Sequence, residues 1–371
     1  MNASTPRQSP AEGDQDAELL SRTARDLPTG RHQFHKEHLM ARIQQLQTSQ
    51  QEEHGGRPGG PARTRRLRLP RPAVTLPALA AGLAAAVVAG VVVNDGGGVA
   101  DGGVATGPGL TTEIGAASSE GVPQLLDRIS LAAAASGHPT VEPGQYVYVE
   151  SRTADTFLRT VGGTTTLASH EPHRRQVWRS ADGTKGRLVD PAVNDSAEGE
   201  TLSLPDERGN TPVADLNSPS YDYLAGLTTD PDKLLATIYK ETRGMGNTPD
   251  QQAFTTIGDL LGESYPPAEL YSALFRTAAK IPGVVVVDDA VDAAGRHGVA
   301  VARLDEASGQ REEWIFDRKT HVFLGERVVQ VKRNTGTEAL LKPGTVVFTS
   351  AVLKRAVVNG IKETPTASQE G

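Results

Sequence analysis

Three histidines lie close together near the start of the chain, at His32, His35 and His38, with Glu37 beside them. Imidazole nitrogens are common ligands of zinc, so this cluster is the best candidate for a metal site. On a regular helix, however, the first and third of these positions lie about 120° apart around the axis. The three rings therefore do not converge, and the pattern is more typical of solvated histidines than of a metal site.

Paired carboxylates provide a second candidate. Asp288 and Asp289 follow a run of four valines, and Asp292 stands three residues further on. Such a group can bind a cation or act as acid and base. Aspartates that cap a loop at the end of a strand are much commoner, so we expect a loop cap here.

No compact catalytic signature occurs in the sequence. It contains no Gly-x-Ser-x-Gly, no phosphate-binding loop and no His-Glu-x-x-His. It also contains no Cys, which excludes a thiol nucleophile, a Cys-ligated zinc site and an iron–sulfur cluster. We expect neither a cofactor nor a metal, and we favour a protein that is not an enzyme. A Ser–His–Asp arrangement stays open, because such triads assemble from distant positions.

Four aromatic residues are the candidate lining of a ligand groove. Trp178 and Trp314 alternate with charged neighbours, and Tyr146 and Tyr148 alternate with valines. Alternation of this kind is typical of a strand with one covered face. Aromatic side chains on that face either anchor a core or line a groove that holds lipid, peptide or glycan. Both alternatives stay open.

The charge of the chain is divided between its two ends. Residues 1–93 hold 12 Lys and Arg against 8 Asp and Glu, whereas the remaining residues hold 26 against 37. Binding of nucleic acid requires cations that neutralise phosphates. The acidic main body therefore argues against a nucleic-acid partner.

Residues 73–93 form a run of 21 without a charge, rich in Ala, Val and Leu. A helix of that length spans about 31 Å, close to the hydrocarbon thickness of a lipid bilayer. Arginines crowd the N-terminal flank, and beyond the run no Lys or Arg follows until Arg128. The positive-inside rule predicts one membrane span, with residues 1–72 cytoplasmic and residues 94–371 outside. The residues that determine this topology are Arg63, Arg65, Arg66, Arg68 and Arg71.

Two protein contacts are expected around this span. Small residues repeat every four positions, at Ala78, Gly82, Ala86 and Gly90, a spacing that lets two such helices pack closely as a dimer. Residues 1–72 combine a short helical stretch with an Arg-rich juxtamembrane linker and have no core of their own. This tail is either a docking segment for a cytoplasmic protein or a loosely ordered extension.

The rest of the chain alternates helix and strand patterns. Residues 94–121 contain 9 Gly and no aromatic residue, which is typical of a flexible tether. Residues 122–360 form the expected folded domain, and residues 361–371 a disordered tail. Apolar spacing predicts helices at 122–136, 231–242, 250–262 and 267–280. Runs with a period of two predict strands at 146–149, 174–179, 185–189, 284–287, 299–304, 313–317, 322–332 and 346–357.

The fold class that these elements predict is α+β. Consecutive strands joined by short turns form antiparallel rather than parallel sheets. We therefore expect a single transmembrane helix, followed by a curved meander or half-barrel with a three-helix insertion in mid-chain.

A set of short motifs accompanies this layout. They are Trp178-Arg179-Ser180-Ala181-Asp182-Gly183, Leu227-Thr228-Thr229-Asp230-Pro231, Leu260-Leu261, Ile281-Pro282-Gly283-Val284, the stretch 292–298, and Ile315-Phe316-Asp317 leading to Leu324-Gly325. In these motifs and its Arg-flanked span the chain resembles an uncharacterised actinobacterial family of single-pass membrane-anchored proteins. The resemblance implies a layout and no activity. The chain departs from it after Asp317, with Arg318 and His321 where similar chains have Pro and Gly.

More distantly, the predicted layout is similar to the half-barrels of lipoprotein carriers and of sensor domains that bind anti-sigma factors. Those folds hold lipid or peptide on a concave sheet face, although a fold does not imply a function. We expect an envelope protein whose outer domain binds a lipid, peptide or protein ligand, with a regulatory role for the cytoplasmic segment. The alternatives are an anchored hydrolase of cell-wall or lipid substrates and a structural tether. An open apolar cleft would favour binding.

Overall fold

The computed structural model describes residues 104, 106–138, 140–161, 163–193, 198–206 and 209–365. The predicted cytoplasmic tail with its histidines, the arginine cluster and the predicted span 73–93 lie outside these residues. Within the described part of the chain, no helix is both long and apolar enough to cross a bilayer.

The described chain is α+β, as the sequence predicts, and its strands form one large antiparallel sheet. The order across the sheet is β2-β8-β9-β10-β11-β12-β3-β5-β6-β7, with β4 paired to β3 and β1. Strands β8 to β12 follow one another as a meander, and β12 then pairs with β3 from the start of the domain. The strand bounds are β1 Thr106–Pro108, β2 Ala117–Ser118, β3 Tyr146–Val161, β4 Thr164–His170, β5 His173–Ser180, β6 Lys185–Val189, β7 Glu200–Ser203, β8 Val284–Val291, β9 His297–Asp305, β10 Gln310–Phe316, β11 Phe323–Gln330 and β12 Val346–Val358.

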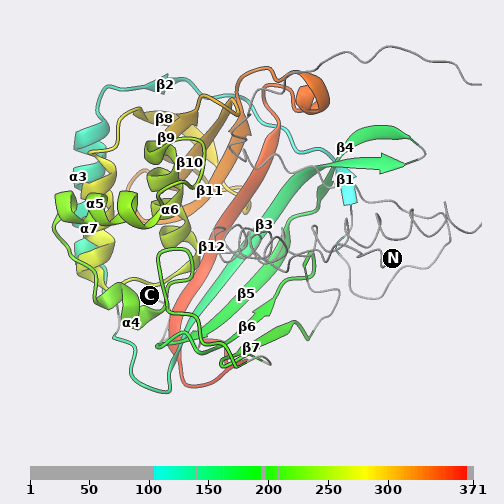
Figure 1. Ribbon diagram of the computed structural model, residues 1–371. Helices are drawn as coiled ribbons and strands as arrows, with labels where there is room; N and C mark the ends of the chain where they lie inside the picture. The colour runs from blue at the N-terminus through cyan, green and yellow to red at the C-terminus, as the bar shows by residue number, and fades with distance from the viewer. Residues whose placement is uncertain are drawn as a thin grey trace, which may run out of the picture.

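The α-helices lie together over one part of this sheet (Figure 1). Those with three or more turns are α3 Val122–Ala135, α5 Pro231–Glu241, α6 Pro249–Glu263 and α7 Ala268–Ala278. Two short ones, α4 Tyr221–Ala225 and the 3-10 helix η1 Gly336–Leu340, complete the set within the described residues. The three predicted insertion helices are confirmed, with ends shifted by no more than two residues.

Local capping explains where the insertion helices begin. The side chain of Asp230 accepts hydrogen bonds from the backbone N–H groups of Asp232 and Lys233, and Thr248 accepts from Gln251. A proline occupies the first turn of both helices. Side-chain oxygens at the N-cap satisfy donors that have no partner inside a helix, and proline lacks the donor altogether.

The main core lies between α3, α5, α6, α7 and the face of β8–β11 that they cover, here called the helix face. Trp314 and Phe316 alternate along β10 on this face, and the ring of Trp314 stacks on Phe254 of α6 with centroids 3.8 Å apart. Phe275 of α7 meets Phe316 edge to face. Period-two alternation in the strand and 3.6-residue spacing in the helices bring these rings together.

The opposite face, here called the far face, is covered on β10 and β11 by the segment that precedes α3. Arg311 Nη2 donates to Gly115 O at 3.0 Å, and Arg327 Nη1 donates to Thr112 Oγ1 at 3.1 Å. Between the two arginines, Glu313 is fully buried and accepts from both, at 2.7 and 2.6 Å. Part of the predicted tether, residues 94–121, is therefore bound to the sheet. Its partners lie about 200 residues away in the sequence, so the composition of the tether does not reveal the contact.

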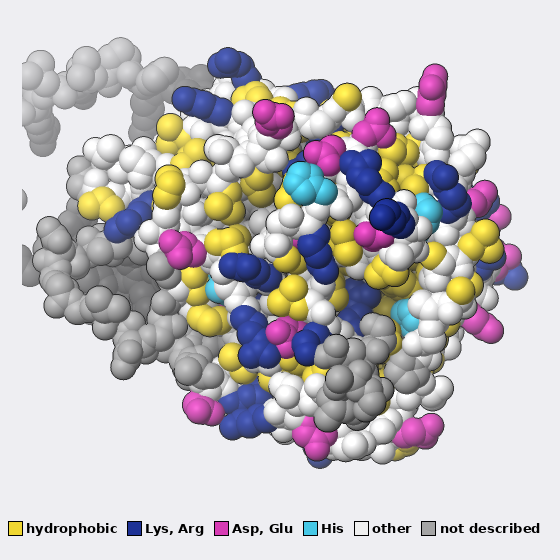
Figure 2. Space-filling view, turned by 180° about the vertical axis from the view of Figure 1, so that it is seen from behind, with side chains coloured by type: hydrophobic (Ala, Val, Ile, Leu, Met, Phe, Trp, Pro, Cys, Tyr) yellow, Lys and Arg dark blue, Asp and Glu magenta, His cyan; other side chains and the backbone are white. Residues whose placement is uncertain are grey.

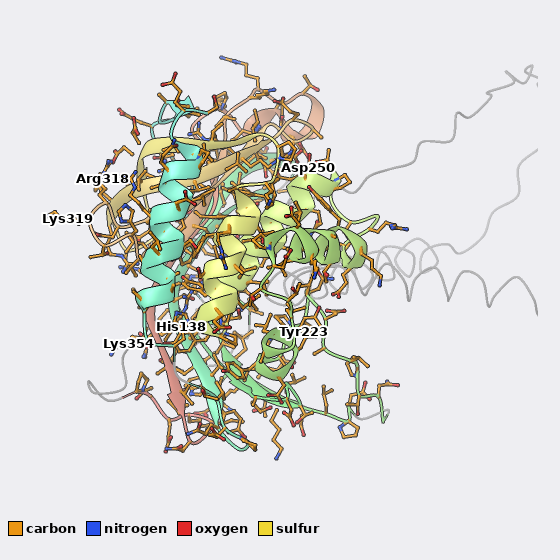
Figure 3. The ribbon with its side chains drawn as sticks, turned by 90° about the vertical axis from the view of Figure 1, so that its left-hand side faces the viewer. His138, Tyr223, Asp250, Arg318, Lys319 and Lys354 are labelled. Carbon is orange, nitrogen blue, oxygen red and sulfur yellow. The ribbon has the colours of Figure 1, made fainter. Side chains whose placement is uncertain are left out.

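Charged side chains of both signs cover the rear of the molecule. Lys and Arg lie there among Asp, Glu and apolar side chains (Figure 2). The exposed hairpin after β10 belongs to this side: Arg318 and Lys319 project away from the helices at the edge of the molecule in Figure 3.

Candidate ligand site

A hollow opens on the helix face at the end of the sheet that the long helices leave uncovered. It encloses about 350 Å³, including the solvent at its mouth. Its lining comes from β3, β5, α4 and the turn between α6 and α7: Val147, Val149, Val177, Arg179, Ser180, Pro219, Ser220, Tyr221, Leu224, Glu263, Ser264 and Tyr265.

The floor of the hollow is aliphatic because two strands present the same face in register. Val149 of β3 stands opposite Val177 of β5, and Val147 stands opposite Arg179. Side chains two residues apart on a strand point to one face, so all four line the hollow. Leu224 of α4 adds an apolar wall.

One wall is the turn after α6, which is held against the end of α3. Tyr265 lies there, with its ring centroid 4.7 Å from that of His138, and His138 Nδ1 is 2.7 Å from Pro266 O. His138 also lies 4.8 Å from the ring of Tyr271. Burial lowers the pKa of His138, and the positive charge of Arg355 acts in the same direction. Figure 3 shows His138 and Tyr223 at the same end of the helix layer.

The other wall is α4, which one phenol ties to α5. The hydroxyl of Tyr223 donates to Glu241 Oε2 at 2.6 Å. Burial and this carboxylate both raise the pKa of Tyr223, because both disfavour the phenolate. Ser220 caps α4 by accepting from Tyr223 N at 3.1 Å. The sequence analysis missed α4, since five helical residues show no periodicity.

Two opposite charges line the hollow. Arg179 is half-buried, and its Nη1 donates to Pro219 O at 2.7 Å. Burial lowers the pKa of Arg179 because desolvation disfavours the charged form. Glu263 lies at the end of α6, where its carboxylate is 3.7 Å from Arg175 Nη2.

A buried ion pair continues along β5 beside the hollow. His173 Nε2 lies 3.0 Å from Asp190 Oδ1 and 3.2 Å from Thr153 Oγ1. Burial on its own would lower the pKa of His173, but the hydrogen bonds to Asp190 and to the backbone of Glu171, together with the nearby carboxylate charges, outweigh it and the pKa is raised. The pKa of Asp190 is lowered, because His173 and Arg175 outweigh its own desolvation. Both shifts favour the ionised form of the pair.

This pair does not have the geometry of a catalytic triad. In a triad one ring nitrogen of the histidine faces the hydroxyl and the other faces the carboxylate. Here Thr153 and Asp190 share Nε2, while Nδ1 of His173 lies 2.9 Å from the backbone oxygen of Glu171. A second pair, His170 Nδ1 and Asp155 Oδ1 at 2.8 Å, has no hydroxyl bonded to His170 among the described residues.

The four aromatic residues predicted to line a groove lie in two places, and none of them lines this hollow. Trp314 is fully buried on the helix face, where its Nε1 donates to Glu312 Oε1 at 3.2 Å. Tyr148 and Trp178 pack on the far face with centroids 5.1 Å apart, and Tyr146 contacts the same cluster. Trp178 Nε1 donates to Glu363 O, so residues at the start of the predicted C-terminal tail cover it.

Of the three aspartates, Asp292 caps the loop after β8, as predicted, whereas Asp288 and Asp289 belong to the strand itself. Asp292 Oδ1 accepts from the backbone N–H groups of Ala294 and Arg296, and its Oδ2 accepts from Arg296 Nε at 2.6 Å. Asp289 pairs instead with His297 and Arg318 on the surface. Across the described ranges, no cluster of three or more His, Cys, Asp or Glu has the arrangement of a metal site.

Sequence reasoning missed the residues that line the hollow. The alternation around Val147, Val149, Val177 and Arg179 was visible, and the Trp178 motif contains Arg179. Their pairing across β3 and β5 and the return of Tyr265 to the same place depend on tertiary contacts. The predicted Trp178 lies on the opposite face of β5 from these residues.

Comparison with known proteins adds no assignment: neither the protein-family models nor the curated proteins include one that matches this chain.

Proposed function

We propose that this chain is a single-pass membrane-anchored envelope protein whose outer α+β domain binds an amphiphilic ligand, a lipid or a peptide, without chemical conversion. The observation that carries the proposal is the aliphatic hollow beside the helix layer. Ligand sites are typically concave and mostly apolar, with a few polar groups that orient the ligand. The hollow has this composition.

Binding accounts for the site better than hydrolysis does. A general base must be neutral to accept a proton, whereas Asp190 raises the pKa of His173 and favours its charged form. The hydroxyl of Thr153 and the carboxylate of Asp190 also meet the same ring nitrogen of His173. The anchored hydrolase remains the alternative, and conversion of a bound ligand in the experiment below would favour it.

The membrane layout in this proposal rests on the sequence of residues 1–93. An uncharged run of 21 residues after an arginine cluster supports one bilayer span with the N-terminus inside the cell. Protease treatment of intact cells tests it: the outer domain should be digested while residues 1–72 survive. A pulldown with residues 1–72 tests for a cytoplasmic protein partner, and crosslinking through the span tests for a dimer.

Photolabelling tests the hollow directly in the full chain. The protein is reconstituted in phosphatidylcholine nanodiscs and irradiated with a diazirine-bearing decanol, and labelled peptides are mapped by mass spectrometry. We expect label at 145–149, 174–180, 219–224 and 263–265. The variant Val177→Trp should lose most of it, because the indole fills the hollow, whereas Val322→Trp at an exposed position should not.

Two outcomes would contradict the proposal. One is label confined to residues 73–93. The other is label near β3 and β5 that Val177→Trp leaves unchanged, because that label would then lie elsewhere.

A further inference from the structure

The serine hydroxyls around the hollow are already engaged within the fold. Ser180 Oγ donates to Asp182 Oδ1 at 2.6 Å and accepts from Lys185 N at 2.9 Å. Ser220 Oγ accepts from the N–H of Tyr223. Ser264 Oγ donates to Leu260 O at 2.6 Å. These hydroxyls stabilise turns and helix ends, so they are not the groups that would orient a ligand.

The groups that remain open are mainly hydrogen-bond donors. Arg179 uses Nη1 for Pro219 O, and its other nitrogens bond to none of the described residues. The phenol oxygens of Tyr221 and Tyr265 likewise have no hydrogen bond within the described part of the chain. Arg179 carries five N–H donors in a planar fork that matches a carboxylate or a phosphate.

A second cation lies beside the floor, on the neighbouring strand. Arg355 of β12 stands opposite Val149 of β3 and is only 9% exposed. Its Nη2 donates to Leu261 O, and its guanidinium packs over the rings of Tyr271 and Phe323. No acidic side chain pairs with Arg355 among the described residues. Burial raises the pKa of Tyr265, and the positive charge of Arg355 acts in the opposite direction with a smaller effect.

Glu263, the carboxylate that lines the hollow, already interacts with a different arginine. Glu263 lies 3.7 Å from Arg175 Nη2, whereas no carboxylate of the described chain lies within ion-pair distance of Arg179. Arg179 is half-buried and has no ion pair, although the charge of Glu263 acts on it, so an anion placed beside Arg179 would stabilise it further. The charge at the apolar floor is therefore complementary to a negative group.

We propose that the hollow takes a single alkyl chain that ends in a carboxylate or a phosphate monoester, with the alkyl chain on the valine floor and the anionic head on Arg179. This inference rests on the proposed function and specifies its ligand class. The phenols of Tyr221 and Tyr265 supply the remaining donors to the head.

The test compares head groups on one alkyl diazirine in the full chain in phosphatidylcholine nanodiscs. Four probes carry a carboxylate, a phosphate monoester, a hydroxyl or a trimethylammonium head. Label on the hollow peptides is divided by the total label on the chain, which corrects for partition into the bilayer. We expect the carboxylate or the phosphate to exceed the hydroxyl at least about tenfold, as a charged hydrogen bond predicts. The stronger of the two identifies the head.

Single substitutions test whether Arg179 causes the preference for an anionic head group. Arg179→Gln should reduce the anionic preference to about that of the hydroxyl probe, and Arg179→Lys should retain part of it. Arg152→Gln removes an exposed arginine from the neighbouring strand β3 and should leave the preference unchanged. Circular dichroism spectra that match the parent exclude misfolding, and Arg179→Lys supplies a reading should the Gln variant fail to fold.

Three results would overturn the inference. Equal labelling by all heads, with Val177→Trp still abolishing it, would leave the proposed function standing without a charge preference. A preference for trimethylammonium would assign the head to Glu263 instead. An anionic preference that survives Arg179→Gln would mean that Arg179 does not hold the head. Absence of label in the hollow with every probe would overturn the proposed function as well.

Discussion

The two ends of the sheet use the same helix face in different ways. On β8 to β11 this face is filled by rings and aliphatic side chains from α6 and α7, including a stacked pair with centroids 3.8 Å apart. On β3 and β5 the same face carries Val147, Val149 and Val177 together with His173, Arg175 and Arg179, beside a hollow. The difference follows from helix length, because α4 has five residues and covers little of the sheet. One end stabilises the fold, and the other carries the proposed ligand site.

The largest contrast should appear when one side chain is truncated at each end. Trp314→Ala removes a fully buried ring that packs on Phe254, and we expect unfolding to become easier by about 3–5 kcal/mol. Val177→Ala removes a half-buried floor residue and should cost less than about 1.5 kcal/mol. Thermal unfolding of the full chain in detergent measures both. Equal losses would mean that the two ends contribute alike to stability.

The far face offers a comparable test with charges. Glu313→Ala leaves Arg311 and Arg327 buried without their shared acid, and the expected loss is about 3–5 kcal/mol. Glu198 also pairs with two cations, Arg187 and Lys362, but it is exposed to solvent, so Glu198→Ala should give no measurable change. The same unfolding assay applies. A stable Glu313→Ala protein would show that the segment before α3 does not depend on this cluster.

At the end of the sheet beside the hollow, His173 should make the free energy of unfolding depend on pH. The expected effect is smaller, about 1–2 kcal/mol. The folded state raises the pKa of His173 above its ordinary value of 6.5, so its stabilising contribution is complete below that pH. The contribution is lost as the pH rises through the folded pKa. His173→Gln should therefore differ most from the parent below pH 6.5, and the difference should shrink as the pH rises. Unfolding temperatures across this range decide the matter, and a constant difference would contradict it.

The smallest of the four effects should come from His138, which follows α3. Its effect on stability should change with pH in the opposite direction to that of His173. The pKa of His138 is lowered from 6.5 by burial, so the folded state prefers the neutral ring. Stability from this group is present above pH 6.5 and falls as the pH drops below it. His138→Gln should remove part of the acid destabilisation of the parent. Parallel pH profiles for the parent and this variant would mean that His138 does not titrate between its tyrosines.

Sequence reasoning located the elements better than the site. The helix at 250–262 and the strand at 299–304 carry clear 3.6- and two-residue periods, and both lie within about two residues of their structural bounds at the ends. Strand β3 is far longer than predicted, at 16 residues, because its second half carries threonines and charges rather than a strict apolar alternation. The pairings of β1 and β2 were missed because their partners are distant in sequence.

The sequence by itself determined the fold class, the cysteine-free chemistry, the capped insertion helices and the expectation of a bilayer span. Each of these follows from composition or from periods within about twenty residues. Tertiary structure alone decided which side chains share a space: Val149 meets Val177, Arg179 faces Pro219, and Tyr265 returns beside them. Strand register and chain reversal bring these residues together, and a one-residue change of register would send each side chain to the other face. No local pattern encodes that choice.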